Sequence, residues 1–243
     1  MRDYKKELEN RTEFIRKIVS DSNSKGIVYG NSGGKDSALV GILCKKACEN
    51  TIGLLMPCQS RRNFEIDMVD GLEVAKQFSI ETRTFDLTDL KTLAMETIGR
   101  YITLSDIAKA NIAPRLRMIT LYAVAASEKR LVAGTGNASE AYMGYFTKWG
   151  DGAHDFNPIA DLTVTEIYEF LEFLDAPRGI IEKAPSAGLF EGQTDEGEMG
   201  ITYKKIDDYL LKGEVTAADK ALIEQYHAVS EHKRHMPVTY GDK

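Results

Sequence analysis

A glycine-rich turn between two apolar runs restricts this chain more than any other feature of its sequence. The run at 26–29 predicts a strand, and the run at 38–44 predicts the start of a buried helix. Between them stands Gly30-Asn31-Ser32-Gly33-Gly34-Lys35-Asp36-Ser37. Two adjacent glycines permit a sharp bend, and the first N–H groups of the following helix have no partner within that helix. A strand, a tight turn and a helix N-terminus in this order predict an anion-binding site.

Two common nucleotide-binding motifs do not fit this turn. A Walker A loop requires Ser or Thr after its lysine, whereas Asp36 follows Lys35. The dinucleotide fingerprint requires three glycines at a spacing that is absent here. A carboxylate beside a bound phosphate is repelled unless a cation lies between them, so we interpret Asp36 as a Mg²⁺ ligand. The alternative is a plain glycine turn in which Asp36 is the helix N-cap.

Length, charge and cysteine content exclude several classes of protein. The 243 residues suffice for a substantial core, and we expect one α/β domain over 1–243. A net charge of −6 provides no basic field for nucleic acid. The charged N-terminus is unlike a signal peptide, and no apolar run is long enough to cross a membrane. Three cysteines without a CxxC pattern, at 44, 48 and 58, favour reduced thiols and a cytoplasmic location.

Predicted strands and helices alternate along the first 140 residues. The predicted strands are 26–29, 51–56, 80–85 and 130–133, and the predicted helices are 2–20, 38–49, 65–78 and 105–129. This alternation predicts an α/β fold with a doubly wound, mostly parallel sheet and helices on both faces. Ligands of such folds bind at the carboxyl ends of the strands, where the loops at 30–37, 57–63 and 134–140 lie.

Several details of these helices are also predicted. The helix at 105–129 is expected to be interrupted by Pro114, with Arg117 left unpacked. The helix at 65–78 is expected to turn its apolar residues towards the core, namely Ile66, Val69, Leu72, Val74, Ala75 and Phe78. Further helices are predicted near 163–174, 202–211 and 216–230. The stretch 183–200 is predicted to be a long loop, either a lid or plain surface.

The segment Ser-Gly-Gly-Lys-Asp-Ser at 32–37 resembles the pyrophosphate-binding PP-loop of the N-type ATP pyrophosphatases. Two further segments narrow this resemblance: Asn111 to Met118, and Gly134 to Glu140 with its continuation to Pro158. Together they resemble the NAD synthetase family, as do 185–189, 192–196 and the tail His232-Lys233-Arg234. The resemblance extends from about Lys17 to Pro237. It implies an adenine nucleotide alpha hydrolase-like fold.

The resemblance implies a carbon–nitrogen ligase that joins ammonia to the carboxylate of deamido-NAD⁺, while ATP is converted into AMP and pyrophosphate. A carboxylate is a poor electrophile because its leaving group would be oxide. Adenylation replaces that leaving group by AMP. Mg²⁺ and backbone N–H groups must neutralise the departing pyrophosphate, so catalysis rests mainly on positioning and electrostatics.

The resemblance also implies roles for individual residues. Asp36 and Glu140 would hold Mg²⁺, and Asp151 would accept a hydrogen bond from ammonia or ammonium, so that Lys35, Asp36 and Asp151 form the catalytic set. The residues implied to bind ATP are Gly30, Asn31, Ser32, Gly33, Gly34, Lys35, Asp36, Ser37, Thr135, Val164 and Ser186. The residues implied to bind deamido-NAD⁺ are Arg115, Lys148, Asp155, His232 and Lys233.

The sequence departs from the family pattern at one position. Many members resemble Asp-Leu-Tyr-Lys-Thr where this chain has Asp-Leu-Thr-Val-Thr, and the lysine there contacts an ATP phosphate. Val164 occupies that place, so one cation is missing. Our hypothesis is that Lys35, or a nearby Arg61 or Arg62, supplies the missing charge.

The resemblance further implies a homodimer whose dinucleotide site lies at the interface. Glutamine-dependent relatives carry an amidase domain ahead of this one. Because only a short segment precedes the glycine turn here, the expected nitrogen donor is free ammonia, or ammonia from a separate glutaminase.

Two alternative functions stay open. One is another PP-loop enzyme that modifies tRNA or aminates another nucleotide, although the acidic balance and the missing CxxC argue against tRNA. The other is a nucleotide-binding relative without catalysis.

Overall fold

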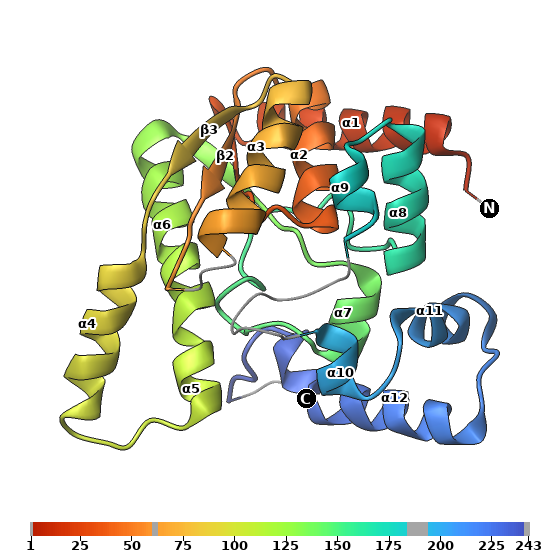
Figure 1. Cartoon of the computed structure of the whole chain (residues 1–243). Coiled ribbons are helices and arrows are strands. Elements are labelled where there is room, and N and C mark those ends of the chain that lie inside the picture. Colours follow the sequence, from red (N-terminus) through yellow and green to blue (C-terminus); the bar gives the residue numbers. More distant parts are fainter. Residues whose placement is uncertain (1, 60–62, 184–193, 241–243) are drawn as a thin grey trace.

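The computed structural model describes residues 2–59, 63–183 and 194–240, and within them four parallel strands form one sheet (Figure 1). The strands are β1 (Gly26–Gly30), β2 (Thr51–Leu55), β3 (Glu81–Thr84) and β4 (Arg130–Ala133), in the order β3-β2-β1-β4. β1 lies between β2 and β4, so that Val28 pairs with Ile52 and with Val132. The predicted doubly wound parallel sheet is confirmed.

Both faces of the sheet are covered by helices, because successive strand residues point to opposite sides. On one face, α2 (Lys35–Ala47) and α3 (Met68–Gln77) pack against the strands. Around α2 lie α1 (Tyr4–Asp21), α8 (Val164–Phe173) and α9 (Arg178–Ile181). On the other face, α6 (Ile112–Glu128) packs against β1 and β4. The result is an apolar core on each side of the sheet.

Two groups of helices extend from this sandwich (Figure 1). The first is an arm in which α4 (Thr88–Gly99) and α5 (Asp106–Ala110) contact α6. The second contains α7 (Ala138–Met143), α10 (Asp195–Met199), α11 (Tyr203–Lys212), α12 (Ala217–Val229) and the 3₁₀ turn Glu231–Lys233. Met143, Ile206 and Ile223 lie in the apolar cluster of this second group.

Pro114 does not interrupt the helix predicted at 105–129. The break lies at Asn111, between α5 and α6, and Pro114 lies in the first turn of α6. A residue in the first turn has no intrahelical acceptor for its N–H, so proline is tolerated there. Arg117 is not left unpacked either, because its Nε donates to the carbonyl of Met56 at 3.1 Å.

The apolar period predicted for 65–78 is also wrong in its first half. Ile66, Val69 and Leu72 are 50%, 58% and 44% exposed, whereas Val74 and Ala75 are buried. A π-helical stretch, Asn63–Asp67, precedes α3 and changes the phase at which residues face the core.

The loop predicted at 183–200 is only partly tested. Its residues 195–199 form helix α10 instead, whereas 184–193 lie outside the described residues. In the part of the chain that the structure describes, no helix combines the length and the apolarity needed to cross a membrane.

Candidate active site

A cavity of about 660 Å³ opens where the loops after β1, β2 and β4 meet. Its volume lies within the usual range for small-molecule sites. The predicted site residues on its walls are Gly30, Asn31, Ser32, Gly34, Lys35, Asp36, Ser37, Thr135, Glu140, Asp151 and Lys233. Residues of α5, α6 and the stretch after α7 complete the walls. The fold therefore brings these predicted residues together around one cavity at the carboxyl edge of the sheet.

The glycine turn after β1 is fixed by hydrogen bonds of its own side chains. Buried Asn31 accepts from the N–H of Gly33 at 3.3 Å and donates to the carbonyl of Gly71 in α3 at 2.9 Å. The Ser37 hydroxyl donates to the carbonyl of Gly34 at 3.0 Å. Gly33 has a φ of +68°, in the left-handed region that favours glycine.

The N-terminus of α2 borders the cavity and is free of side-chain caps. Gly34 is the N-cap residue, and it offers no side-chain oxygen to the first amides of the helix. Gly34, Lys35 and Asp36 all line the cavity. Uncapped amides at the positive end of a helix dipole are suited to bind a phosphate group.

The two predicted metal ligands meet beside this helix end, with a lysine between them. Asp36 lies in the first turn of α2, and Glu140 lies in α7. The Nζ of Lys35 is 2.7 Å from Asp36 Oδ2 and 3.8 Å from Glu140 Oε1. Asn137, which caps α7, also donates through Nδ2 to Asp36 Oδ1 at 3.0 Å. Helix α7 therefore delivers both Glu140 and the amide that holds Asp36.

This pair of carboxylates fits Mg²⁺. The ion prefers oxygen ligands, and it often takes one or two carboxylates together with phosphate oxygens and water. Among the described residues, no group of three or more His, Cys, Asp or Glu side chains is placed to hold a metal alone. Asp36 and Glu140 would hold the ion jointly with a bound phosphate. The Lys35 ammonium lies beside both carboxylates, which shows that this position attracts positive charge.

The charges around Lys35 affect one another strongly. Burial, and then the charge of Asp36, raise the pKa of Glu140 to about 8. Burial disfavours the Lys35 ammonium, but Asp36 and Glu140 outweigh it and raise the pKa of Lys35 above its usual value. The ammonium also lies 5.6 Å from the ring centroid of Tyr203. Lys35 is therefore a charged group enclosed in the site.

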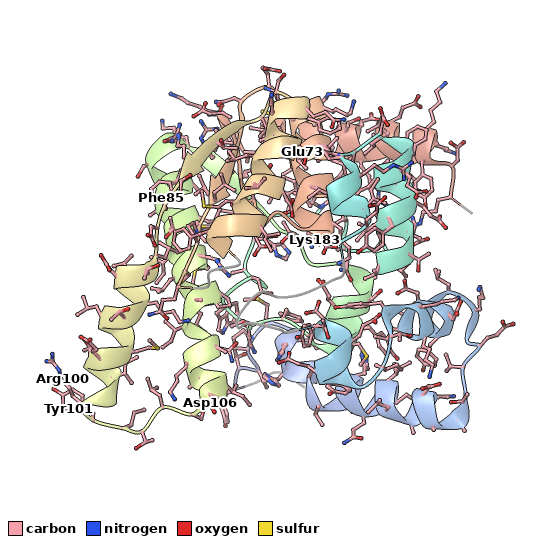
Figure 2. The ribbon with its side chains drawn as sticks, in the orientation of Figure 1. Glu73, Phe85, Arg100, Tyr101, Asp106 and Lys183 are labelled. Atoms are coloured by element: carbon pink, nitrogen blue, oxygen red, sulfur yellow. The ribbon has the colours of Figure 1, made fainter. Side chains whose placement is uncertain are left out.

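A second lysine holds the turn from another side. Lys183, at the end of the α9 region, donates to Asp67 Oδ1 at 2.8 Å, Asp70 Oδ2 at 2.6 Å and the carbonyl of Gly33 at 3.1 Å. Figure 2 shows Lys183 below α3, at the centre of the view. No sequence pattern indicated this contact, because the residues are more than 100 positions apart and meet only through the fold.

Asp151 and Arg117 are further polar residues of the cavity wall. The N–H of Thr147 donates to Asp151 Oδ1 at 3.0 Å, and burial raises the pKa of Asp151. Arg117 also lines the cavity, and burial lowers the pKa of its guanidinium. No sequence pattern predicted Arg117 as a site residue; it lies one helical turn before Leu121, which lines the same cavity.

The residues predicted to bind deamido-NAD⁺ separate into two sets. Lys233 lines the cavity and donates to two backbone carbonyls, of Gly144 and Phe146, at 2.8 Å each. Arg115, Lys148 and His232 form a chain outside it: Arg115 donates to the carbonyl of Lys148 at 3.3 Å, and Lys148 Nζ donates to the carbonyl of His232.

Two other predicted residues, Asp155 and Val164, are described but do not line the cavity. Asp155 accepts from the N–H of Val132 at 2.8 Å and from the hydroxyl of Tyr122 at 3.2 Å, so it supports β4. Val164 packs in the apolar cluster of the second helix group and is 4% exposed. Ser186 lies outside the described residues, as do Arg61 and Arg62.

Known proteins resemble this chain over nearly its whole length. Residues 7–237 match the family model described as NAD synthase. The NH₃-dependent NAD⁺ synthetase of Carboxydothermus hydrogenoformans is 43% identical over 238 residues, which cover 97% of each chain. Among solved structures, NMN synthetase from Francisella tularensis has a TM-score of 0.93 at 37% identity and covers both chains completely. The NH₃-dependent NAD synthetase from Campylobacter jejuni, in complex with nitrate, has a TM-score of 0.80 at 31% identity and covers 99% of this chain and 100% of its own.

Proposed function

The chain belongs to the NAD synthase family, and we propose that its cavity catalyses the ATP-dependent amidation of deamido-NAD⁺ by ammonia. The observation that carries the proposal is the meeting of Asp36 and Glu140 beside the uncapped N-terminus of α2. A carboxylate pair next to a phosphate cradle suits release of pyrophosphate from ATP. Free ammonia is the proposed nitrogen donor, and the whole chain is proposed to act as one domain.

In the first step, a carboxylate oxygen of deamido-NAD⁺ attacks the α-phosphorus of ATP. The bond from that phosphorus to the bridging oxygen breaks, and pyrophosphate leaves with the electron pair. The turn at 32–34 and the first amides of α2 bind the departing anion. Mg²⁺, when bound at Asp36 and Glu140, supplies positive charge to the phosphates.

In the second step, ammonia attacks the acyl carbon of the adenylate. The carbon–oxygen bond breaks, AMP leaves with the electron pair, and the new amide nitrogen loses a proton. Asp151 is proposed to hold the ammonia and accept that proton, because burial raises the pKa of its carboxylate and makes it a stronger base. Its Oδ1 is oriented by the N–H of Thr147.

The test is a complete reaction with its products measured separately. The protein is incubated with deamido-NAD⁺, ATP, Mg²⁺ and ammonium, and NAD⁺, AMP and ADP are quantified. We expect NAD⁺ and AMP in equal amounts, and loss of both in Asp36→Asn. Production of ADP, or ATP binding without any turnover, would reject the proposal.

A second substrate is favoured by one observation. NMN synthetase, a protein named for a mononucleotide product, shares the whole length of this chain at a TM-score of 0.93. The second candidate is therefore amidation of nicotinate mononucleotide by the same two steps. Comparing kcat/KM for the mononucleotide and for deamido-NAD⁺ at saturating ATP decides between them, because both substrates offer the same nicotinate carboxylate.

We also propose that the protein is a homodimer formed through the α4–α6 arm, with the dinucleotide site at the interface. In the described structure, α4 and α5 contain no buried residue. Yet this arm exposes large apolar side chains, namely Leu90, Leu93, Ile102, Ile107 and Ile119. An apolar surface of this kind is typical of a protein interface.

The proposed location of the protein is the cytoplasm. Its three free cysteines are in keeping with a reducing compartment of this kind.

A further inference from the structure

We propose that Lys35 is a built-in counter-ion that occupies the cation position between Asp36 and Glu140 when no nucleotide is bound, and that a divalent cation must displace it. The inference rests on the proposed function only in taking these two carboxylates as the metal ligands. It adds that the nucleotide-free protein holds little metal, because its own ammonium already fills the site.

The first support is the position of the ammonium. Lys35 Nζ is 2.7 Å from Asp36 Oδ2 and 3.8 Å from Glu140 Oε1, so it bridges carboxylates from two different helices. Its side chain is only 5% exposed. A lysine ammonium is a compact point charge, which suits a position for a single cation better than a planar guanidinium would.

The second support is the surroundings that hold this position. Asn137 Nδ2 keeps Asp36 in place at 3.0 Å, and the ring of Tyr203 lies 5.6 Å from the ammonium. The Tyr203 hydroxyl donates to Asp195 Oδ2 at 3.1 Å, so a third carboxylate lies at the hydroxyl end of this ring. The site is thus negative on several sides, with Lys35 as the cation at its centre.

The third support is the energetic consequence of removing that cation. Two carboxylates held together without a counter-ion repel each other and are poorly hydrated. A divalent ion would relieve that repulsion, so a chain without Lys35 should bind metal readily. With Lys35 present, metal binds well only together with ATP, whose phosphates give the displaced ammonium another anion to pair with. Lys35 therefore couples metal binding to nucleotide binding.

The experiment measures Mn²⁺ binding to the nucleotide-free protein, by the loss of the electron paramagnetic resonance signal of free Mn²⁺. The proteins are the wild type, Lys35→Met and the control Lys45→Met. Lys45 lies on the same helix, and its carboxylate partner Glu49 is remote from the cavity lining. We expect Lys35→Met to bind Mn²⁺ roughly tenfold or more tightly than the wild type, as expected when unpaired buried carboxylates regain a cation. Lys45→Met should match the wild type.

Two further variants cover poor folding of Lys35→Met. Lys35→Gln removes the charge but keeps a polar side chain, and it should gain Mn²⁺ affinity in the same way. Lys35→Arg keeps the charge and should bind Mn²⁺ as weakly as the wild type. The inference is overturned if a folded Lys35→Met or Lys35→Gln shows no gain, or if the nucleotide-free wild type already binds Mn²⁺ as tightly as they do.

A separate measurement distinguishes failure of this inference from failure of the proposed function. Mn²⁺ binding by the wild type is repeated with a non-hydrolysable ATP analogue present. Normal binding under these conditions, together with no gain in the uncharged variants, rejects the role of Lys35 alone. If the protein with the analogue binds no more Mn²⁺ than the analogue alone does in solution, the metal site is rejected. The inference about Lys35 is then rejected with it.

Discussion

Tyr29 places a phenol between α2 and β2, where two glycines leave room for it. A Cβ at Gly41 would lie 2.3 Å from the Tyr29 hydroxyl, and one at Gly53 would lie 2.9 Å from it. The side chain is fully buried, and within the described part of the chain its hydroxyl has no hydrogen-bond partner. A buried hydroxyl without a partner reduces stability, and burial accordingly raises the pKa of Tyr29.

We therefore expect Tyr29→Phe to stabilise the protein by about 1 kcal/mol, because it removes the unpaired hydroxyl and keeps the ring. The measurement is urea-induced unfolding. Tyr4→Phe is the matched control, since the Tyr4 hydroxyl donates to Glu169 Oε2 at 2.6 Å and its loss should destabilise the protein. Equal losses of stability in both variants would contradict the conclusion that the Tyr29 hydroxyl has no hydrogen-bond partner.

At Lys35, the prediction concerns ATP rather than metal alone. Lys35→Ala removes the cation that would face the phosphates once a metal ion has entered, a charge not supplied by Val164. We expect a KM for ATP raised by about tenfold, the loss typical of one charge-assisted hydrogen bond, and slower release of pyrophosphate. Cys48→Ala, a thiol at the end of α2 away from the cavity lining, is the control. Equal, small effects of both changes would show that Lys35 does not serve the phosphates.

At the scale of elements, α1 is attached to the loop before α8 by a paired arginine. Arg11 donates through both terminal nitrogens to Asp161, at 2.6 and 2.8 Å, and it also donates to the carbonyl of Pro158 at 2.6 Å. The contact with Arg11 lowers the pKa of Asp161 below its usual value. The ion pair therefore stabilises the fold above the unfolded-state pKa of about 4 and is lost as the pH falls through the lower pKa of the folded state.

We expect Asp161→Asn to be less stable than the wild type near neutral pH, by at most about 1 kcal/mol because the carboxylate is half exposed. This gap should close as the pH falls below about 4, since protonation then removes the ion pair from the wild type as well. Urea unfolding of both proteins at a series of pH values measures this difference in the free energy of unfolding. Asp21→Asn, which breaks an exposed pair with Lys17, should show little change at any pH. A gap that widens in acid would refute the pairing.

Lys183 connects two other elements, the glycine turn and α3. In Lys183→Met the carbonyl of Gly33 loses its partner, and Asp67 and Asp70 lose their cation. We expect the KM for ATP to rise by roughly threefold to tenfold, in keeping with ~1 kcal/mol for one such hydrogen bond, with recovery in Lys183→Arg. Lys204→Met, which removes an exposed pair with Asp208 on α11, is the control. An unchanged KM for ATP in Lys183→Met would mean that the glycine turn keeps its shape without the contacts of Lys183.

For the whole molecule, local patterns predicted the parallel sheet and most helices, because the apolar runs of β1 and β2 and the period of α8 report burial directly. They failed where a backbone irregularity shifts the period, as at the π-helical stretch before α3. They also missed contacts made only by folding, such as Lys183 with Asp67 and Asp70. In the site, the motifs predicted that Asp36 and Glu140 would be close. No motif indicates that the ammonium of Lys35 lies beside both carboxylates.

The exposed arm makes a prediction about assembly. Leu93 in α4 and Ile119 in α6 are 58% and 57% exposed, and the two helices contact each other. Figure 2 shows Arg100 and Tyr101 at the tip of this arm, away from the sheet. Exposed apolar side chains on two packed helices are poorly solvated by water, and a second copy of the chain would cover them.

We therefore expect the wild type to sediment as a dimer at micromolar concentration, and Leu93→Glu combined with Ile119→Glu to sediment as a folded monomer. In a homodimer the double variant would place four carboxylates without partners in the interface, and burying them costs several kcal/mol, which is expected to prevent association. Leu211→Glu, at a leucine on α11 that is 50% exposed, should leave the dimer intact. If the dinucleotide site lies across the interface, the monomer should lose turnover of deamido-NAD⁺ while ATP still binds at the turn. A double variant that remains dimeric would place the interface on another face of the molecule.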